Sequence, residues 1–293
     1  MRISVILPAK NEAHSLSKLL GDLHKQLPAA EIIVVDDGSS DDTASVAEAG
    51  GARVIRHRYS MGNGAAIKTG ARNALGEVLV FMDADSQHAP ADIRVLLAAL
   101  DEGFDLAIGT RSGQAHASFA RRLANSIYNR LASWITGHEI RDLTSGFRAV
   151  RASMFRQFLS LLPNGFSYPT TSTMAFLRAG YGVIFVPVHV RARASGTQSH
   201  IRPLRDGGRF LLIIFKVGTL FSPLKIFAPV SATLFAVGCW YYAYTFITSG
   251  RFTNAGVLLI TTSILTFLIG LVSEQITQLL YARLESGSED PRR

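Results

Sequence analysis

Two long apolar stretches stand in tandem near the C-terminal end of the chain, and they restrict what it can fold into more than any other feature. Residues 224–248 carry one charged side chain, Lys225, and residues 255–273 carry none. Each stretch is close to the roughly 20 residues that a helix needs to cross the hydrocarbon core of a bilayer. Two buried core helices are the alternative, but the tandem arrangement favours two transmembrane helices.

Basic side chains are concentrated on both flanks of these stretches. Before the first stretch they are Arg191, Arg193, Arg202, Arg205, Arg209, Lys216 and Lys225. After the second they are Arg283, Arg292 and Arg293, whereas the connection between the stretches carries Arg251. Because basic flanks stay on the cytoplasmic side and bind anionic headgroups, we expect a multi-pass protein of the inner (cytoplasmic) membrane, with the N-terminal domain and both termini in the cytoplasm. The same distribution accounts for the net charge of +8 without nucleic acid as a partner.

The segment before the first apolar stretch has the pattern of an interfacial helix. Its apolar run, residues 210–215, is too short to cross a membrane, and Arg209 and Lys216 stand seven residues apart on one side of a helix. Such a helix lies along the membrane surface, and a packed core helix is the alternative. We therefore expect an N-terminal domain in residues 1–200, a juxtamembrane helix in 201–222, a transmembrane hairpin in 223–282 and a polar tail in 283–293.

The first 190 residues alternate between strand and helix patterns. Strands are predicted at residues 2–9, 31–39, 52–57, 77–85, 105–112 and 182–190, and helices at 11–27, 41–50, 63–76, 90–103 and 118–137. In the last helix an apolar stripe opposite Arg122, Asn125 and Asn129 predicts an amphipathic helix. The stripe recurs every four residues and consists of Phe119, Leu123, Ile127, Leu131 and Ile135. The alternation is typical of an α/β fold, with a mostly parallel sheet and helices on both faces.

Acidic and amide side chains follow three of these strands. The fourth strand ends in FMDADSQ, which places Asp83, Asp85 and Gln87 at alternate positions before a helix pattern that opens with Pro90. A cap formed by Asp85 or Ser86 is the alternative explanation, but two aspartates and a glutamine exceed what a cap needs. In open α/β sheets, ligands bind at this strand-to-helix edge.

The first two strands end in the same way. They bring the side chains of Pro8, Asn11, Glu12, Asp36 and Asp37 to the same edge of the sheet. A cleft of carboxylates without His or Cys ligands suits a hard cation, Mg²⁺ or Mn²⁺. Such a cation commonly accompanies a diphosphate, because it neutralises the charge of the leaving group.

Five motifs in a fixed order give the chain a family resemblance. LPAKNE, VVDDGSSDDT, the DAD of FMDADSQ, GTRS and DLTSGFRAVR resemble those of an inverting family-2 glycosyltransferase with a GT-A fold. The resemblance covers roughly residues 3–200, and the two apolar stretches continue it. Within the family, the chain is most similar to the polyprenyl-phosphate glycosyltransferases, which include dolichol-phosphate mannose synthase and bacterial undecaprenyl-phosphate glucosyltransferases.

The resemblance implies a role for each matching residue. The donor nucleotide sugar would contact Pro8, Ala9, Asn11, Glu12, Asp36, Asp37 and Asp83. The metal would be held by Asp83, Asp85 and Gln87. Arg111, Ser145 and Arg148 would face the acceptor phosphate or the donor diphosphate, so that Asp83, Asp85, Arg111 and Arg148 form the catalytic set. Alternatives remain for three residues: Arg148 as a solvated helix start, Asp142 as a cap, and His88 as a helix-surface residue rather than a ligand.

One departure from the family pattern concerns the acceptor. The family often ends its catalytic domain in Gly-x-Ser-Lys, whereas here Ser199 is followed by His200. Either His200 or one of Arg202 and Arg205 would then contact the lipid phosphate. A histidine contact would make phosphate binding depend on pH.

The predicted reaction is transfer of a sugar from a UDP-glucose-type or GDP-mannose-type donor to a polyprenyl phosphate, with undecaprenyl phosphate as the expected acceptor. A phosphate anion is a competent nucleophile, which agrees with a sequence that has no obvious His–Asp pair. In-line attack would invert the anomeric centre. The alternatives are another acceptor, such as a polysaccharide or glycolipid, and a non-catalytic nucleotide-binding scaffold. A homo-oligomer is compatible with the sequence.

Overall fold

The computed structural model describes residues 1–111, 119–165, 167–188, 212, 215–216, 218–251 and 253–286. The chain forms two compact units. The N-terminal unit consists of Met1–Ser133 and His138–Leu211, and the C-terminal unit consists of Trp134–Gly137 and Leu212–Arg293.

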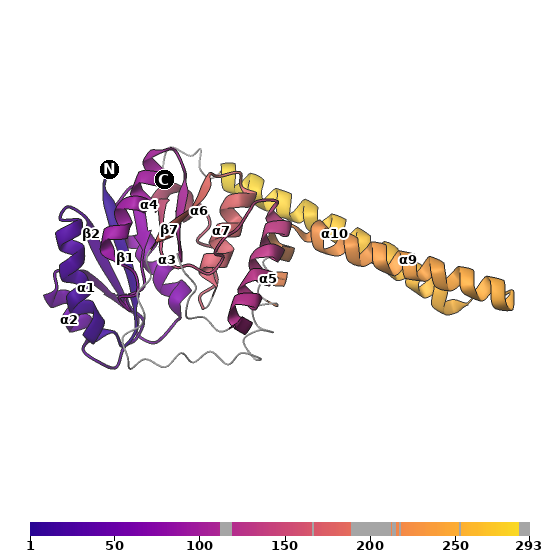
Figure 1. Cartoon of the computed structure of the whole chain (residues 1–293), viewed down its shortest axis with the longest axis horizontal. Coiled ribbons are helices and arrows are strands. Elements are labelled where there is room, and N and C mark those ends of the chain that lie inside the picture. Colours follow the sequence, from indigo (N-terminus) through magenta and orange to yellow (C-terminus); the bar gives the residue numbers. More distant parts are fainter. Residues whose placement is uncertain are drawn as a thin grey trace. The chain divides into compact units, whose positions relative to one another are not determined.

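A seven-stranded sheet is the centre of the N-terminal unit (Figure 1). Its strands are β1 (Ile3–Ala9), β2 (Glu31–Asp36), β3 (Arg53–Arg56), β4 (Val78–Phe81), β5 (Leu106–Arg111), β6 (Arg148–Arg151) and β7 (Val183–Val188). The order is β3-β2-β1-β4-β6-β5-β7, and β6 runs antiparallel to both of its neighbours while the remaining pairs are parallel. The prediction of a mostly parallel sheet is therefore confirmed.

Helices accompany the sheet of the N-terminal unit. They are α1 (Ala13–Gln26), α2 (Thr43–Ala49), α3 (Asn63–Asn73), the 3₁₀ turn η1 (Pro90–Asp92), α4 (Ile93–Asp101), α5 (Phe119–Thr136), α6 (Ala152–Gln157) and α7 (Tyr168–Arg178). In α1, Leu16, Leu20 and Leu23 are fully buried and join Val5 and Val34 of the sheet in one core. Burying one such side chain contributes about 2 kcal/mol, so this face fixes α1 on the sheet.

The segment between α5 and β7 differs from expectation. β6, α6 and α7 were not predicted, and Arg148 is the first residue of a central strand rather than the start of a solvated helix. Because β6 is antiparallel, its first residue lies opposite Phe81 at the carboxyl end of β4. This places the motif before β6 beside the end of β4.

The buried face of α5 is also offset from the predicted stripe. Ile127 is 51% exposed, whereas Tyr128 and Ala132 are buried. The Asn129 side chain, expected on the polar side, also forms hydrogen bonds within the protein. Its amide donates to the Arg141 carbonyl at 2.6 Å and accepts from the Leu143 amide at 3.2 Å. Asn129 thus provides partners for two loop backbone groups, while Ile135 of the predicted stripe is buried as expected.

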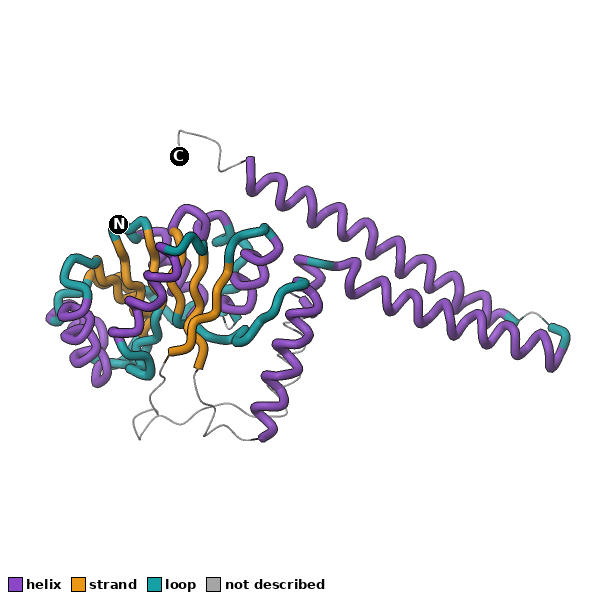
Figure 2. Tube along the Cα trace, turned by 45° about the horizontal axis from the view of Figure 1, so that its top comes forward, coloured by secondary structure: helices purple, strands orange, loops and turns teal. Residues whose placement is uncertain are grey.

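Two long antiparallel helices form the C-terminal unit, and Figure 2 shows them side by side. They are α9 (Pro223–Ser249) and α10 (Asn254–Ser286). Both are long and apolar enough to cross a membrane, yet only 11% of the most apolar window of α9 and 17% of that of α10 is buried. Apolar side chains such as Trp240, Ile247 and Leu268 point outward. Core helices would bury these side chains, so the surface favours membrane spans.

Small and polar residues fix how the two helices meet. Ser231 Oγ donates to the Ser263 carbonyl at 2.9 Å, and Ser263 Oγ donates to the Ser231 carbonyl at 3.0 Å. At the start of α9, the Leu224 amide donates to Glu274 Oε2 at 3.1 Å. Glu274, the acid within the predicted spans, therefore satisfies a helix-end amide that would otherwise lack a partner.

The other predicted segment boundaries are described only in part. Residues 201–211, 213–214 and 217 lie outside the described residues, while Leu212, Phe215 and Lys216 are helical and exposed. The interfacial helix stays a prediction. α10 continues to Ser286, into the segment expected to be a polar tail, and residues 287–293 lie outside the described part.

Candidate active site

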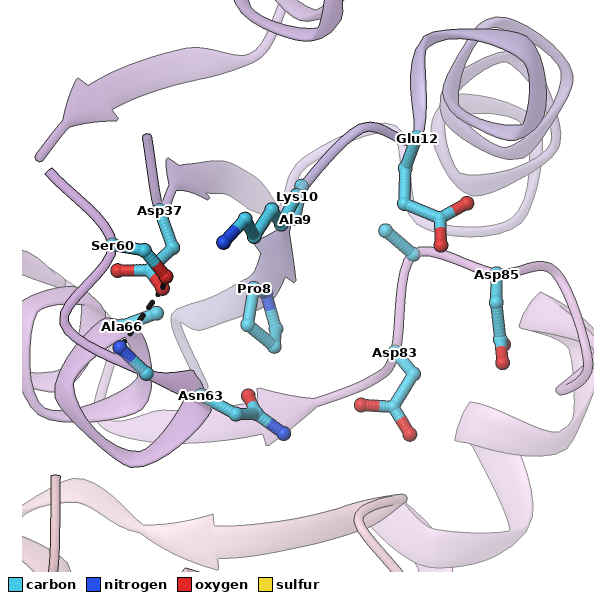
Figure 3. Close-up of a pocket in the computed structure, with 12 residues that line it drawn as sticks. Pro8, Ala9, Lys10, Glu12, Asp37, Ser60, Asn63, Ala66, Asp83 and Asp85 are labelled. Atoms are coloured by element: carbon cyan, nitrogen blue, oxygen red, sulfur yellow. Dashed lines mark hydrogen bonds between the residues drawn. The ribbon is translucent and has the colours of Figure 1, made fainter. Parts of the chain in front are cut away.

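A pocket of about 400 Å³ lies at the edge of the sheet where β1, β2 and β4 end. Figure 3 shows Asp37 and Ser60 at one end, Glu12 and Asp85 at the other, and Pro8 between them. The residues that line it are Pro8, Ala9, Lys10, Glu12, Asp37, Ser60, Gly62, Asn63, Ala66, Asp83, Ala84 and Asp85. Parallel pairing brings these strand ends to one level, with Ala9 opposite Asp36.

Asp83 and Asp85 enter this pocket from the end of β4. The strand is fully buried through Met82, and the two aspartates that follow are half-buried. Between them and the next helix, Ser86 adopts a left-handed backbone conformation with φ of 59°. The cap explanation does not hold, because Ala89 is the N-cap residue of η1 and no side chain caps η1 or α4. Gln87 does not line the pocket, and its backbone amide donates to Asp85 Oδ1 at 3.1 Å.

The fit of this site to a metal depends on how many ligands the chain supplies. Among the described residues, no three His, Cys, Asp or Glu side chains gather around one point. Asp83 and Asp85 offer two carboxylates. Mg²⁺ keeps several waters and is commonly bound through one or two carboxylates together with substrate phosphates. The residues therefore fit a hard cation that arrives with a diphosphate, rather than a closed metal site.

Asp37 is held by a network that the sequence did not reveal. Its carboxylate accepts hydrogen bonds from the ring of His57 at 2.7 Å and from Ser60 Oγ, the Met61 amide and the Gly62 amide at 2.8 Å each. Burial raises the pKa of Asp37, but these hydrogen bonds outweigh it and hold the pKa below its ordinary value.

The expectation of no His–Asp pair was wrong. His57 lies 20 positions from Asp37, and its other ring nitrogen meets Thr69 Oγ1 at 2.9 Å. With both carboxylate oxygens engaged, Asp37 organises the loop of residues 57–62 as well as lining the pocket.

Six pocket residues were not predicted from the sequence. Ser60 and Gly62 come from the loop between β3 and α3, Asn63 and Ala66 from α3, Lys10 from the end of β1, and Ala84 from the segment after β4. Gly62 has φ of 101°, and a Cβ there would come within 2.7 Å of the Asn164 carbonyl. The GNG sequence after the third strand was the available signal for a tight turn at the site.

Asn11 and Asp36 lie beside the pocket rather than in its lining. Asn11 Oδ1 accepts from the Ser40 amide at 2.8 Å, and the Asp36 carboxylate accepts from the Ser39 amide at 2.9 Å. Asn11 thus connects the turn after β1 to the turn after β2, whereas Asp36 holds the turn after β2 itself. Glu12 lines the pocket, and its carboxylate accepts from Ser15 Oγ at 2.5 Å.

Two of the residues expected to face phosphate groups, Ser145 and Arg148, lie in the interior of the protein. Arg148 is fully buried and Ser145 is buried, and both form hydrogen bonds within the protein. Arg111 ends β5, and its side chain is not among the described ones. Ser199, His200, Arg202 and Arg205 lie outside the described residues.

Two further expectations near the site can be compared with the structure. His88 is not on a helix surface, since it is 5% exposed and stacks on the Phe147 ring at 4.7 Å. Asp142 accepts hydrogen bonds from the amide and hydroxyl of Thr144, both at 3.0 Å, which is a turn-stabilising arrangement.

Comparison with known families identifies both units. Residues 4–159 match the family described as glycosyl transferase family 2, and residues 222–279 match the GtrB C-terminal hairpin. The chain belongs to glycosyl transferase family 2. The resemblance read from the motifs is confirmed, and the protein is a family-2 glycosyltransferase with a Rossmann-like GT-A fold and two candidate membrane spans.

Similar proteins include several enzymes named for polyprenyl phosphates. The polyprenol monophosphomannose synthase of Mycolicibacterium smegmatis is 37% identical over 67% of this chain and 79% of its own length. The undecaprenyl-phosphate mannosyltransferase of Micrococcus luteus is 32% identical over 67% of this chain and 86% of its own. Among solved structures, the glucosyl-3-phosphoglycerate synthase of Mycobacterium tuberculosis in complex with Mn²⁺, UDP and glucosyl-3-phosphoglycerate is 25% identical, covers 74% of this chain and 78% of that one, and has a TM-score of 0.57.

The charged residues that line the pocket of this family-2 glycosyltransferase are mainly acidic. Four carboxylates line it, from Glu12, Asp37, Asp83 and Asp85, and Lys10 is the basic residue in the lining. The Asp37 carboxylate accepts four hydrogen bonds from the protein. Asp83 and Asp85 offer carboxylate oxygens that suit the coordination of a cation. A diphosphate would therefore need a cation at the Asp83 end of the pocket.

Proposed function

We propose that this chain transfers a sugar from a nucleoside-diphosphate sugar to a polyprenyl phosphate at the cytoplasmic face of the membrane. The observation that carries the proposal is the presence, in one chain, of the strand-edge pocket with Asp83 and Asp85 and of a hairpin with the surface of a membrane span. A soluble acceptor would not require that hairpin. Relatives named for polyprenol and undecaprenyl phosphates support the same acceptor class.

The donor would lie along the pocket from Asp37 to Asp85. Pro8, Ala9 and Glu12 offer surface and hydrogen-bond groups for the nucleoside. Lys10 could meet a phosphate oxygen, because a lysine acts as a point charge toward phosphates. Mg²⁺ or Mn²⁺, bound at Asp83 and Asp85, would supply charge neutralisation for the departing diphosphate. Donors of the UDP-glucose and the GDP-mannose type both fit this arrangement.

The chemistry needs no general base. An oxygen of the acceptor phosphate forms the new bond to the anomeric carbon while the bond from that carbon to the diphosphate breaks, and the anomeric centre inverts. The acceptor is already an anion, so no proton has to be removed. His57 does not serve as a base here, because its two ring nitrogens are engaged with Asp37 and Thr69. Catalysis then rests on positioning and on charge stabilisation.

A labelled-donor assay tests the proposal. Purified full-length protein in detergent is incubated with UDP-glucose, GDP-mannose and related labelled donors, with undecaprenyl phosphate or 3-phosphoglycerate as acceptor. We expect label to enter the lipid extract with one donor, and to stay out of it when EDTA is added. Label on 3-phosphoglycerate alone, or no transfer with any donor, would overturn the proposed acceptor.

Two variants test the site within the same assay. Asp85→Asn removes one carboxylate charge from the pocket and should reduce transfer at least about 100-fold, since positioned charge at such sites contributes several kcal/mol. Asp101→Asn is the matched control, because Asp101 is an exposed carboxylate at the end of α4. Equal activity of both variants would contradict the role of Asp85.

The acceptor phosphate contact is proposed to come from Arg111 and the segment that holds Ser199, His200, Arg202 and Arg205. We favour the arginines over His200, because a permanent charge suits a phosphate site better than a titrating one. Arg202→Ala or Arg205→Ala should then raise the acceptor KM about ten- to hundredfold, by loss of a charge-assisted hydrogen bond. His200→Ala should leave that KM unchanged at pH 6 and pH 8. A pH-dependent KM that His200→Lys abolishes would assign the contact to His200 instead.

A further inference from the structure

The turn formed by Ser145 and Gly146 lies directly behind Asp83. A Cβ added to Gly146 would stand 3.2 Å from Asp83 Oδ2 and 3.6 Å from Oδ1, so the glycine lets the turn approach the carboxylate. This proximity follows from the antiparallel direction of β6, which starts at Arg148 opposite Phe81, two residues before Asp83. The turn therefore limits how far the Asp83 carboxylate can move toward β6.

Three hydrogen bonds hold this turn in place. Ser145 Oγ donates to the Gly109 carbonyl at 2.5 Å, and the Tyr168 hydroxyl donates to the Gly146 carbonyl at 3.1 Å. Arg148 donates through Nη2 to the Ser145 carbonyl. Burial raises the pKa of Tyr168, and the negative charge of Asp83 raises it further against the opposing effect of Arg148, so the phenol keeps its proton and remains a donor.

Arg148 also anchors the turn to the first residues of α7. Its Nη1 donates to the Pro169 carbonyl at 3.2 Å and to Ser172 Oγ at 2.7 Å, and its guanidinium lies 5.6 Å from the centre of the Tyr168 ring. The acceptors it contacts are neutral oxygens, and among the described residues its buried Nε has no hydrogen-bond partner. A buried cation in this state costs stability relative to a well-packed apolar side chain. Packing alone does not explain its presence.

We propose that Tyr168, seated by Arg148, is a positioning residue that fixes the Asp83 carboxylate through the Ser145–Gly146 turn. The inference rests on the proposed function, in which Asp83 helps to hold Mg²⁺ or Mn²⁺. These ions require well-defined ligand geometry, and residues behind the ligands commonly change metal affinity 10–100-fold when altered. Ser145 and Arg148, expected to touch phosphate, thus act from behind the metal ligand.

Direct binding of Mn²⁺ separates this role from a purely structural one. The full-length protein in detergent is titrated with Mn²⁺ in the presence of UDP or GDP, and free Mn²⁺ is measured by electron paramagnetic resonance. Tyr168→Phe keeps the ring and its contact with Arg148 but removes the hydroxyl, so we expect the Mn²⁺ Kd to rise about tenfold while the melting temperature stays close to that of the wild type. Tyr181→Phe is the matched control, since the Tyr181 hydroxyl donates to Gln157 and does not reach the pocket.

Gly146→Ala tests the proximity of the turn to Asp83 by adding a methyl group between them. The added Cβ at 3.2 Å from Asp83 Oδ2 forces the carboxylate aside, and the Mn²⁺ Kd should rise by at least a similar factor. If Gly146→Ala does not fold, Tyr168→Phe decides alone. Wild-type protein that binds no Mn²⁺ in the presence of either UDP or GDP would overturn the proposed metal site and this inference together. Wild-type binding that Tyr168→Phe leaves unchanged would overturn the inference while the proposed function stands.

Discussion

Asp37 is the residue whose surroundings give the clearest expectation for pH dependence. The hydrogen bonds from His57 and the loop of residues 57–62 hold its folded-state pKa below the ordinary value of about 3.9. A carboxyl group with a lowered folded pKa contributes stability at pH values above its unfolded pKa, and that stability is lost as the pH falls through the folded pKa. The contribution is therefore complete at neutral pH and disappears below about pH 4.

Replacing the Asp37 carboxylate should reveal its pH-dependent contribution to stability. Asp37→Asn removes the charge that accepts four hydrogen bonds, and we expect it to lower the free energy of unfolding by about 2 kcal/mol at pH 7. The difference from the wild type should shrink as the pH is lowered toward 3.5. Thermal unfolding in detergent at four pH values measures it. An equal difference at every pH would show that the charge of Asp37 is not responsible.

At the scale of elements, the chain shows which patterns can be read from sequence. β1, β2 and β4 are buried apolar runs that end in polar residues, so both the sheet and the candidate site at Asp83 could be predicted. β6 could not, because its four residues RAVR begin and end with arginine and resemble a polar turn. The buried face of α7 contains Thr170, Ser172 and Thr173, which leave no apolar period to detect. The positions of Ser145 and Arg148 depend on β6 and α7, so the burial of these two residues could not be predicted from the sequence either.

The packing of α3 against the loop of residues 162–165 gives a prediction for one element. Gly64 donates its amide to the Gly165 carbonyl at 3.2 Å, and a Cβ there would stand 2.1 Å from the Pro163 carbonyl oxygen. Gly64→Ala must displace backbone and should lower the free energy of unfolding by about 1–3 kcal/mol. It should also weaken binding of the donor nucleotide, because α3 begins at the pocket residue Asn63.

A second glycine provides the control for that experiment. Gly21 lies in α1, and a Cβ added there would meet nothing within 4 Å. Gly21→Ala should therefore stabilise the protein by about 0.5–1 kcal/mol through helix propensity and the unfolded state. Thermal unfolding of both variants compares the two environments directly. A stabilising Gly64→Ala would show that the loop yields to the new side chain.

At the scale of the whole molecule, charge predicts which way the hairpin faces. The connection between α9 and α10 should lie outside the cytoplasm, since the basic clusters flank the other ends of the helices. In a Cys239→Ser background, Ser249→Cys places an exposed thiol near this connection and should react with an impermeant reagent in intact cells. Ser160→Cys, exposed in the N-terminal unit, should react only after lysis. The reverse pattern would invert the proposed topology.

A hairpin of this kind also changes the dimensions in which enzyme and acceptor meet. If α9 and α10 lie in the bilayer, a lipid acceptor diffuses in the same plane, and its effective concentration is a number per area rather than per volume. Adding detergent to a mixed micelle should then dilute the acceptor without changing its bulk concentration. We expect the acceptor KM in molar units to rise in proportion to detergent, and to stay constant as a mole fraction, while the KM of the water-soluble nucleotide sugar does not change. The reaction rate in a cell would accordingly follow the surface density of the lipid.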